Sequence, residues 1–170
     1  ELKGLLANKI RVKEFNTKHF PDLKCAKTLH IFDLKKISDY NYDFNEPVNF
    51  EELYKKLPKK YIIKCTIGSF NHHIVENNNL EELKSYSNYI VYKRVPELVK
   101  EVHTYNFEPQ HQQYEPQVFI EEYIGDNLID YKFEIINGKI SYLLIKNAWQ
   151  PEMCKFYNEK GEHIDNLFNL

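Results

Sequence analysis

The segment around Lys64 combines residue types that could bind a phosphate group. Lys64 interrupts the otherwise apolar run Tyr61–Cys65, and Gly68 and Ser69 follow closely. A lysine that projects from a strand beside a Gly-Ser turn can place its ammonium against a phosphate, with backbone N–H groups behind it. The alternative interpretation is a lysine on the solvent-facing side of an amphipathic strand. The choice depends on whether the rest of the chain supplies a matching nucleotide site.

Two adjacent carboxylates form a second candidate group. Glu121 and Glu122 end an apolar segment that begins at Val118 and leads to Gly125. Considered locally, the two glutamates only terminate a strand. Considered together with Lys64, they could form a hinge beside a planar ligand.

A third group of charges alternates along one predicted strand. Asp130, Lys132 and Glu134 are separated by two residues each, so their side chains share one face of the strand. The strand ends at Asn137-Gly138, a dipeptide that tolerates the positive φ angles of a type I′ hairpin turn. Such a row of charges is either simply solvated or part of a site.

The predicted hairpin also has an apolar face. Folding about the turn is expected to give three cross-strand pairs, which are Ile135 with Ile140, Phe133 with Tyr142, and Tyr131 with Leu144. These pairs would lie on the face opposite the three charged residues.

Histidine and cysteine give weaker signals. His72 and His73 are neighbours on an expected strand and would point to opposite faces, which disfavours a shared metal. The cysteines lack CxxC spacing and any signature of a nucleophile, and they are Cys25, Cys65 and Cys154. Each is interpreted as a small hydrophobic residue in a reducing compartment, and the protein as cytoplasmic.

Helices and strands of ordinary length are expected to position these residues. In chain order, the expected elements are a helix from residue 1 to about 20, a strand or extended connection at Ala26–Phe32, a loop at Ser38–Asn49, a helix at Asn49–Leu57, strands at Tyr61–Cys65 and His73–Glu76, helices opening at Asn79 and Pro96, a connection at Tyr105–Pro116 and a strand at Val118–Gly125. Asn49 is the expected N-cap of its helix, with Glu52 three residues on. A tight hairpin through Gly68–His72 is expected to join the Lys64 strand to its partner.

Composition limits the classes of protein that fit this chain. With 170 residues, 42% of them apolar and 15% aromatic, the chain is expected to be globular, with one domain or one and a part. A formal net charge of −2 gives no electrostatic footprint for nucleic acid. No apolar stretch approaches the roughly 18 residues that can span a bilayer, so no transmembrane segment is expected.

Taken together, these segments resemble the ATP-grasp superfamily, and within it the TupA-like proteins of teichuronopeptide and surface-polysaccharide biosynthesis. The matching segments are Asn8–Glu14, Leu57–Cys65 followed by Gly68 and Ser69, Ile120–Ile124, Asp130–Phe133, Asn137–Lys139 and Lys155–Asn158. The resemblance spans nearly the whole chain. The order and spacing of these segments carry the resemblance, and no single motif is specific.

The resemblance implies an α+β, ATP-grasp-like fold with two small α+β lobes around a nucleotide cleft. Residues 1–119 would form the first lobe, and residues 120–170 would form the hinge and an incomplete C-terminal lobe. The implied activity is an ATP-dependent ligase of surface polysaccharide or glycopeptide biosynthesis. Such an enzyme joins a carboxylate of a small molecule or glycan to an amine through an acyl-phosphate. The alternative is a non-catalytic nucleotide- or glycan-binding module, or a glycosyltransferase-associated domain.

The resemblance also implies roles for individual residues. The expected ATP contacts are Lys9 and Lys64 at the phosphates, Gly68 and Ser69 in the loop over them, Glu121, Glu122, Tyr123 and Ile124 at the adenine hinge, and Asp130 at the ribose. Lys64 and Lys132 are the expected catalytic residues, and Arg11 and Lys146 are further candidates for phosphate or substrate contacts. Positioned cations and backbone donors are the equipment that phosphoryl transfer needs.

The chain departs from the family pattern in two ways. Its phosphate loop has one glycine where the family has more, which makes close approach of the backbone to phosphate harder. Mg²⁺ is the implied companion of ATP, but the family's Glu and Glu-x-Asn ligands are not found before Leu170. The chain is therefore expected to be a piece of a longer protein, or a relative that binds nucleotide without turning it over.

Overall fold

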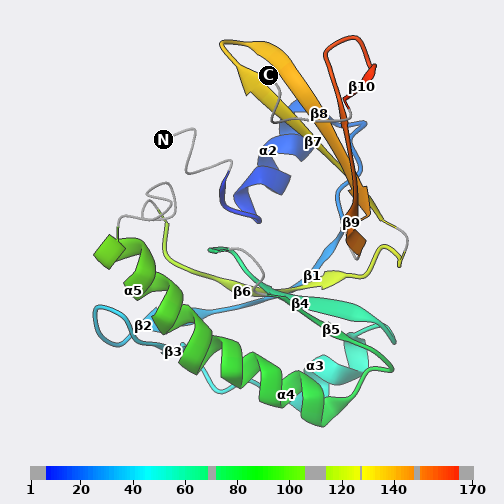
Figure 1. The fold of residues 1–170 in the computed structure, drawn as a ribbon. Helices are drawn as coiled ribbons and strands as arrows, with labels where there is room; N and C mark the ends of the chain where they lie inside the picture. Colours follow the sequence, from blue (N-terminus) through cyan, green and yellow to red (C-terminus); the bar gives the residue numbers. More distant parts are fainter. Residues whose placement is uncertain (1–6, 69–71, 106–113, 127, 148–149, 165–170) are drawn as a thin grey trace. The chain divides into compact units, whose positions relative to one another are not determined.

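The computed structural model describes residues 7–68, 72–105, 114–126, 128–147 and 150–164 (Figure 1). The chain forms two compact units, Glu1–Tyr123 and Ile124–Leu170. Helices and strands both contribute to the first unit, and the described part of the second unit contains strands. The chain is therefore a mixed α+β protein, as predicted, while the ATP-grasp arrangement stays a prediction. The first unit ends within the predicted hinge, whereas the predicted first lobe ended at residue 119.

A four-stranded antiparallel sheet forms the centre of the first unit. Its strands, in spatial order, are β1 (Thr28–Phe32), β6 (Val118–Glu122), β4 (Tyr61–Cys65) and β5 (His72–Val75). Every second residue of β4, from Tyr61 to Cys65, joins the buried core, so the alternating Lys64 lies on the opposite face. The predicted strands at these four places are confirmed.

Helices cover the core face of this sheet (Figure 1). They are α3 (Phe50–Lys56), α4 (Leu80–Tyr89), η1 (Ile90–Arg94) and α5 (Val95–Tyr105). The side chain of Asn49 caps α3 by accepting a hydrogen bond from the Glu52 N–H at 3.1 Å, and Asn79 caps α4 in the same way. The predicted helix starts at these two asparagines are confirmed.

Pro96 does not begin a helix, contrary to the sequence prediction. The helices α4, η1 and α5 follow one another without a break, and Pro96 is the second residue of α5. Just before it, the Val95 N–H donates to the carbonyl of Ile90, five residues back, as in a π-helical turn. Proline lacks an N–H and conflicts with the carbonyl four residues earlier in an ordinary α-helix. The π-helical turn changes that local geometry, and the helix continues past the proline.

The segment predicted as a loop at Ser38–Asn49 contains a strand, which corrects that prediction. Strands β2 (Leu34–Lys36) and β3 (Tyr42–Phe44) pair as a small antiparallel ribbon. Tyr42 and Phe44 are both buried and belong to the core of the first unit. Three residues are too few for a clear alternating pattern, and the polar residues around them are typical of turns.

The first described helix is shorter than the sequence predicts. Helix α2 spans Arg11–His19 and ends before Pro21, as expected, while residues 1–6 lie outside the described residues. Its start is formed by Asn8, whose buried side-chain oxygen accepts from the Ile10 and Arg11 N–H groups at 3.0 Å each. An asparagine side chain can satisfy backbone donors at the beginning of a helix in this way.

The second unit is built on an antiparallel sheet. Its strands, in spatial order, are β10 (His163–Ile164), β9 (Gln150–Tyr157), β8 (Lys139–Asn147) and β7 (Ile129–Ile136). The predicted turn is confirmed, because Asn137 and Gly138 have φ angles of 50° and 76°.

A bulge changes the predicted pairing in this hairpin. Ile135 pairs with Ile140 as predicted, but the register shifts between Glu134 and Ile135. The predicted partners of Phe133 and Tyr131 are therefore wrong. These two residues face Leu143 and Ile145 instead, because β8 contributes one extra residue opposite the shift.

The predicted apolar face of β7 is largely exposed. Tyr131, Phe133 and Ile135 have exposed fractions of 55%, 54% and 61%.

Among the described residues, no helix is long and apolar enough to cross a membrane.

Candidate functional site

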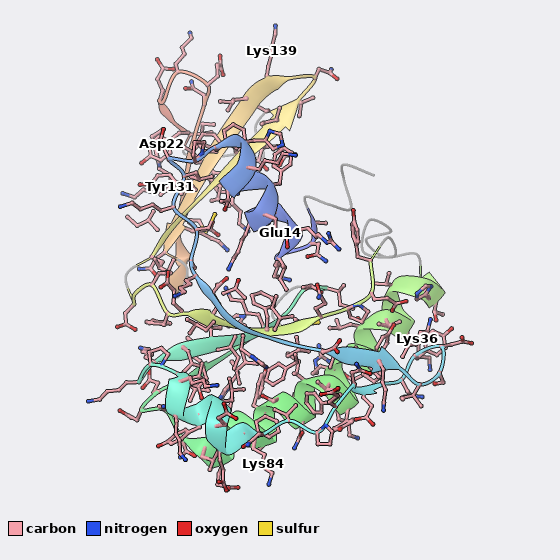
Figure 2. All side chains as sticks on the ribbon, turned by 180° about the vertical axis from the view of Figure 1, so that it is seen from behind. Glu14, Asp22, Lys36, Lys84, Tyr131 and Lys139 are labelled. Atoms are coloured by element: carbon pink, nitrogen blue, oxygen red, sulfur yellow. The ribbon has the colours of Figure 1, made fainter. Side chains whose placement is uncertain are left out.

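The candidate site lies on the face of the first unit's sheet that is opposite the main core. The register pairs Lys64 with Phe119 and Ile62 with Glu121, so all four side chains share this face. Helix α2 lies over it. Figure 2 shows Glu14 of α2 and Lys84 of α4 on opposite sides of the sheet.

Glu121 holds two lysines from different elements at this face. Its carboxylate accepts a hydrogen bond from Lys64 Nζ at 2.5 Å through one oxygen and one from Lys13 Nζ through the other. The Glu121 side chain is only 7% exposed, while those of Lys64 and Lys13 are 26% and 19% exposed. A carboxylate that is this buried requires such compensation by charge and hydrogen bonds.

Further contacts fix the position of Lys13. Its ammonium donates to the backbone oxygen of Ala26 at 2.8 Å and to the Thr28 hydroxyl at 3.3 Å, beside β1. It also lies 5.6 Å from the centre of the Phe119 ring. Lys13 therefore ties α2 to both β1 and β6.

Lys9 connects the same helix region to the end of β4. Its ammonium donates to the backbone oxygen of Gly68 at 2.9 Å and to that of Thr66 at 3.4 Å. Gly68 has a φ angle of 71°, which glycine adopts without strain. Ser69, the other predicted residue of the phosphate loop, lies outside the described residues. Lys9, Lys13, Lys64 and Glu121 together form what we name the lysine cluster.

The lysine cluster carries three ammonium groups and one carboxylate. Its field reaches His72, which pairs with Lys64 in the β4–β5 register. Burial lowers the pKa of His72, and the positive charges of Lys64 and Lys9 lower it further. The neighbouring His73 lies on the other face, where it contacts Glu82. The predicted opposite orientation of the two histidines is confirmed.

The predicted hinge residues lie at the junction of the two units. The carboxylate of Glu122 accepts from the Lys27 N–H at 2.8 Å, and the Glu122 N–H donates to the Lys27 oxygen at 2.9 Å. The ring of Tyr123 lies 4.0 Å below the ammonium of Lys60. Ile124 is 57% exposed and begins the second unit. The side chain of Glu121, the first of the predicted hinge residues, points to the lysine cluster on the sheet face that carries Lys64.

The predicted residues of the second unit form a separate charged group. Asp130 pairs with Lys146 across the β7–β8 ladder, and its carboxylate lies 3.8 Å from Lys146 Nζ and 3.7 Å from Lys132 Nζ. Arg11, the remaining candidate, belongs to the first unit. Its guanidinium lies over the ring of Tyr114 and 3.9 Å from Glu14.

Sequence reasoning missed Lys13 and Asn8. A signal for Lys13 was available, because it follows Lys9 by four residues and so occupies the same face of a helix. Recognising the capping role of Asn8 required the helix boundary, which sequence patterns place poorly.

The residues present fit an anion better than a divalent metal ion. Lysine ammonium groups suit phosphate oxygens, whereas a protein-bound Mg²⁺ requires oxygen ligands such as carboxylates. Within the part of the chain that the structure describes, no three side chains of the His, Cys, Asp and Glu types gather to hold a metal.

Comparison of the chain with protein-family models, with curated proteins and with solved structures found no match. The resemblance to the ATP-grasp superfamily therefore stays a prediction.

Proposed function

We propose that the lysine cluster binds the phosphate groups of a nucleotide, and that this nucleotide is ATP. The observation that supports this proposal is the convergence of Lys9, Lys13 and Lys64 on one sheet face beside the Gly68 turn. Lys64 and Lys13 share the single carboxylate of Glu121, and Lys9 donates to backbone oxygens beside them. Two cations on one carboxylate leave positive charge for an anionic ligand.

The ligand would exchange contacts with groups already in place. Phosphate oxygens can replace the Glu121 carboxylate at Lys64, because both are anionic acceptors of charge-assisted hydrogen bonds. The Lys9 ammonium, now bound to backbone oxygens of the loop, can contact a phosphate at the same end of β4.

The reaction proposed for this site is ATP-dependent ligation of a carboxylate and an amine. A substrate carboxylate oxygen takes the γ-phosphoryl group of ATP, which gives an acyl-phosphate and ADP. The amine then attacks the acyl carbon and releases phosphate and a proton. Lys64 and Lys9 would stabilise charge on the transferred group. The residues Glu121–Ile124 would hold the adenine.

The proposed setting is the assembly of a surface polysaccharide or glycopeptide in the cytoplasm. It follows from the resemblance to TupA-like ATP-grasp proteins. The cytoplasmic setting rests on the three widely separated cysteines, which lack CxxC spacing and fit a reducing compartment.

Binding of a nucleotide or glycan without turnover is the second candidate, in an ATP-grasp-like module or a glycosyltransferase-associated domain. It is favoured by the ion pairs of Glu121, which already give Lys64 and Lys13 a structural role. In such a module the lysines would bind phosphate only by exchange, and no bond would be formed or broken.

Calorimetric titration with ATP, with and without Mg²⁺, tests phosphate binding. We expect Lys64→Met to lower the affinity for ATP at least tenfold. A tenfold change in affinity corresponds to about 1.4 kcal/mol, which is the scale of one hydrogen bond to a charged group. Lys55→Met is the matched control, because Lys55 is exposed on α3 and lies on the other side of the sheet. An unchanged affinity of Lys64→Met, or no binding by the wild type at millimolar ATP, refutes the proposal.

Two further readouts place the ligand and separate the two candidates. Bound phosphates should raise the pKa of His72, because they offset the positive charges that lower it. Hydroxylamine should trap an acyl-phosphate as a hydroxamate, with release of ADP, if the protein is a ligase. ATP binding without a hydroxamate from a panel of carboxylates would favour the non-catalytic module.

A further inference from the structure

A cavity of about 520 Å³ lies in the first unit, between β1 and α3. Its walls come from β1, the loop before α3, and α3 itself. The lining includes Leu29, His30, Phe32, Val48, Leu53 and Leu57. His30 and Phe32 pair with Ile120 and Val118 of the main core, so the cavity lies on the opposite side of the sheet from Lys64. Its size is in the range of ligand-binding pockets, which is about 300–1,000 Å³.

One wall of this cavity is the edge of a sheet. Strand β1 is the outermost strand and pairs with β6 alone. An edge strand presents a row of backbone N–H and C=O groups that can pair with another extended chain. Apart from the β6 ladder, no backbone hydrogen bond reaches Leu29, His30 or Ile31 within the described residues.

His30 adds a polar group to a largely apolar wall. No side-chain hydrogen bond of His30 is present among the described residues, and its ring packs edge-on against Phe32 at 4.7 Å. Burial lowers the pKa of His30, and the charge of Lys56 lowers it further, so the imidazole is neutral at pH 7. A neutral imidazole offers one donor and one acceptor to a ligand.

Opposite charges lie at the two ends of the groove. Lys27 precedes β1 and marks one end. Lys56 is the last residue of α3, the helix that starts shortly after Glu46, so it lies away from Glu46, and it is close enough to influence His30. At the other end, Asp33 follows β1, and its backbone oxygen accepts from the Asn45 N–H at 2.9 Å, which brings Glu46 alongside. The backbones of Lys27 and Asp33 are separated by six residues of extended chain, or about 20 Å, and the charged side chains at the two ends can reach inward, which shortens the span that a ligand has to cover.

The charged side chains have capacity for a ligand. Neither the Lys27 ammonium nor the Glu46 carboxylate has a partner within the described residues. Lys56 pairs with Glu52 at 2.5 Å, but both side chains are more than 60% exposed. An exposed pair of this kind contributes little and can exchange partners.

We propose that this groove binds a short peptide with free termini, about three to five residues long, by antiparallel addition to the edge of β1. The carboxylate of the peptide lies at Lys27 and Lys56, and its ammonium lies at Asp33 and Glu46. Its backbone pairs with β1, and an apolar side chain packs against Leu29 and Leu53. Strand addition supplies affinity through the backbone, and the charges at the two ends fix direction and length.

The test uses the tetrapeptide alanyl-leucyl-valyl-alanine, followed by calorimetry and by NMR of the β1 amides and the His30 ring. We expect saturable binding that shifts both sets of resonances. The same peptide with an acetylated amino end and an amidated carboxyl end should bind at least tenfold more weakly. Lys56→Glu should lower the affinity for the tetrapeptide with free termini at least tenfold, whereas the matched control Lys55→Glu should leave this affinity unchanged.

Four results would overturn the proposal. They are no saturation by millimolar tetrapeptide, equal affinity for the free and blocked peptides, equal loss in Lys56→Glu and Lys55→Glu, and equal affinity for leucine alone. The last result would indicate a small-molecule pocket in place of strand addition. The outcome is separate from that of the ATP titration, since the groove and the lysine cluster lie on opposite faces of the sheet.

Discussion

Replacing Glu121 with Gln should destabilise the first unit by about 3 kcal/mol. The carboxylate accepts hydrogen bonds from Lys64 and Lys13, and a hydrogen bond to a charged group contributes about 1.5–3 kcal/mol. We take the lower end for each bond, because both lysines retain some access to water and can reorient. Glutamine is nearly isosteric with glutamate, but its amide NH₂ opposes one ammonium, and two cations remain without their counter-charge.

Urea denaturation followed by circular dichroism measures this loss. For a chain of this length, about 3 kcal/mol corresponds to a decrease in Tm of roughly 6–12 °C. Amide hydrogen exchange should place the loss in β4 and β6, the strands that carry Lys64 and Glu121. Glu14→Gln is the matched control. Glu14 is 64% exposed and lies 3.9 Å from Arg11, so its loss should cost less than about 0.5 kcal/mol.

A double-mutant cycle isolates the contact itself. Lys64→Met and Glu121→Gln combined should be less destabilising than the sum of the two single changes, with a coupling energy of about 1–2 kcal/mol. Two results would refute the reasoning. One is a Glu121→Gln variant within about 0.5 kcal/mol of the wild type, and the other is strict additivity in the cycle.

Three further predictions follow from burial and charge in the first unit and from exposure in the second. The hydroxyl of Tyr61 is buried without a hydrogen-bond partner among the described residues. Tyr61→Phe should therefore leave the free energy of unfolding unchanged or raise it by up to about 1 kcal/mol, and a clear decrease of that free energy in urea denaturation would contradict this. Burial raises the pKa of the Cys65 thiol to about 11, whereas Cys154 is exposed, so a disulfide reagent should label Cys154 in the native protein and Cys65 only after unfolding. Lys64→Met should raise the pKa of His72 in an NMR titration, because the substitution removes a positive charge that lowers this pKa. An unchanged pKa would show that Lys64 does not lie close to His72.

Local signals predicted those elements whose stability depends on neighbouring residues. The side-chain caps of Asn49 and Asn79 form as the sequence indicates, as does the Asn137-Gly138 turn. Each is a contact or backbone conformation within a few residues, so a short pattern contains most of the information.

Predictions that depended on distant residues were less accurate. The apolar residues Tyr42 and Phe44 form a strand because β2 pairs with them and the core covers them, although the surrounding composition is that of a loop. The bulge after Glu134 depends on how the two hairpin strands fit together, which simple alternation does not contain.

By itself, the sequence determined that Lys64 occupies a strand, that this strand leads into a glycine turn, and that Glu121 ends another strand. The tertiary structure alone decided that these residues meet. Lys64 and Glu121 are 57 residues apart in the chain, and Lys13 and Glu121 are 108 apart. Their contact requires β4 and β6 to pair in one register and α2 to cover the sheet. The sign and position of a charge are local properties, but the counter-charge that it meets depends on long-range pairing.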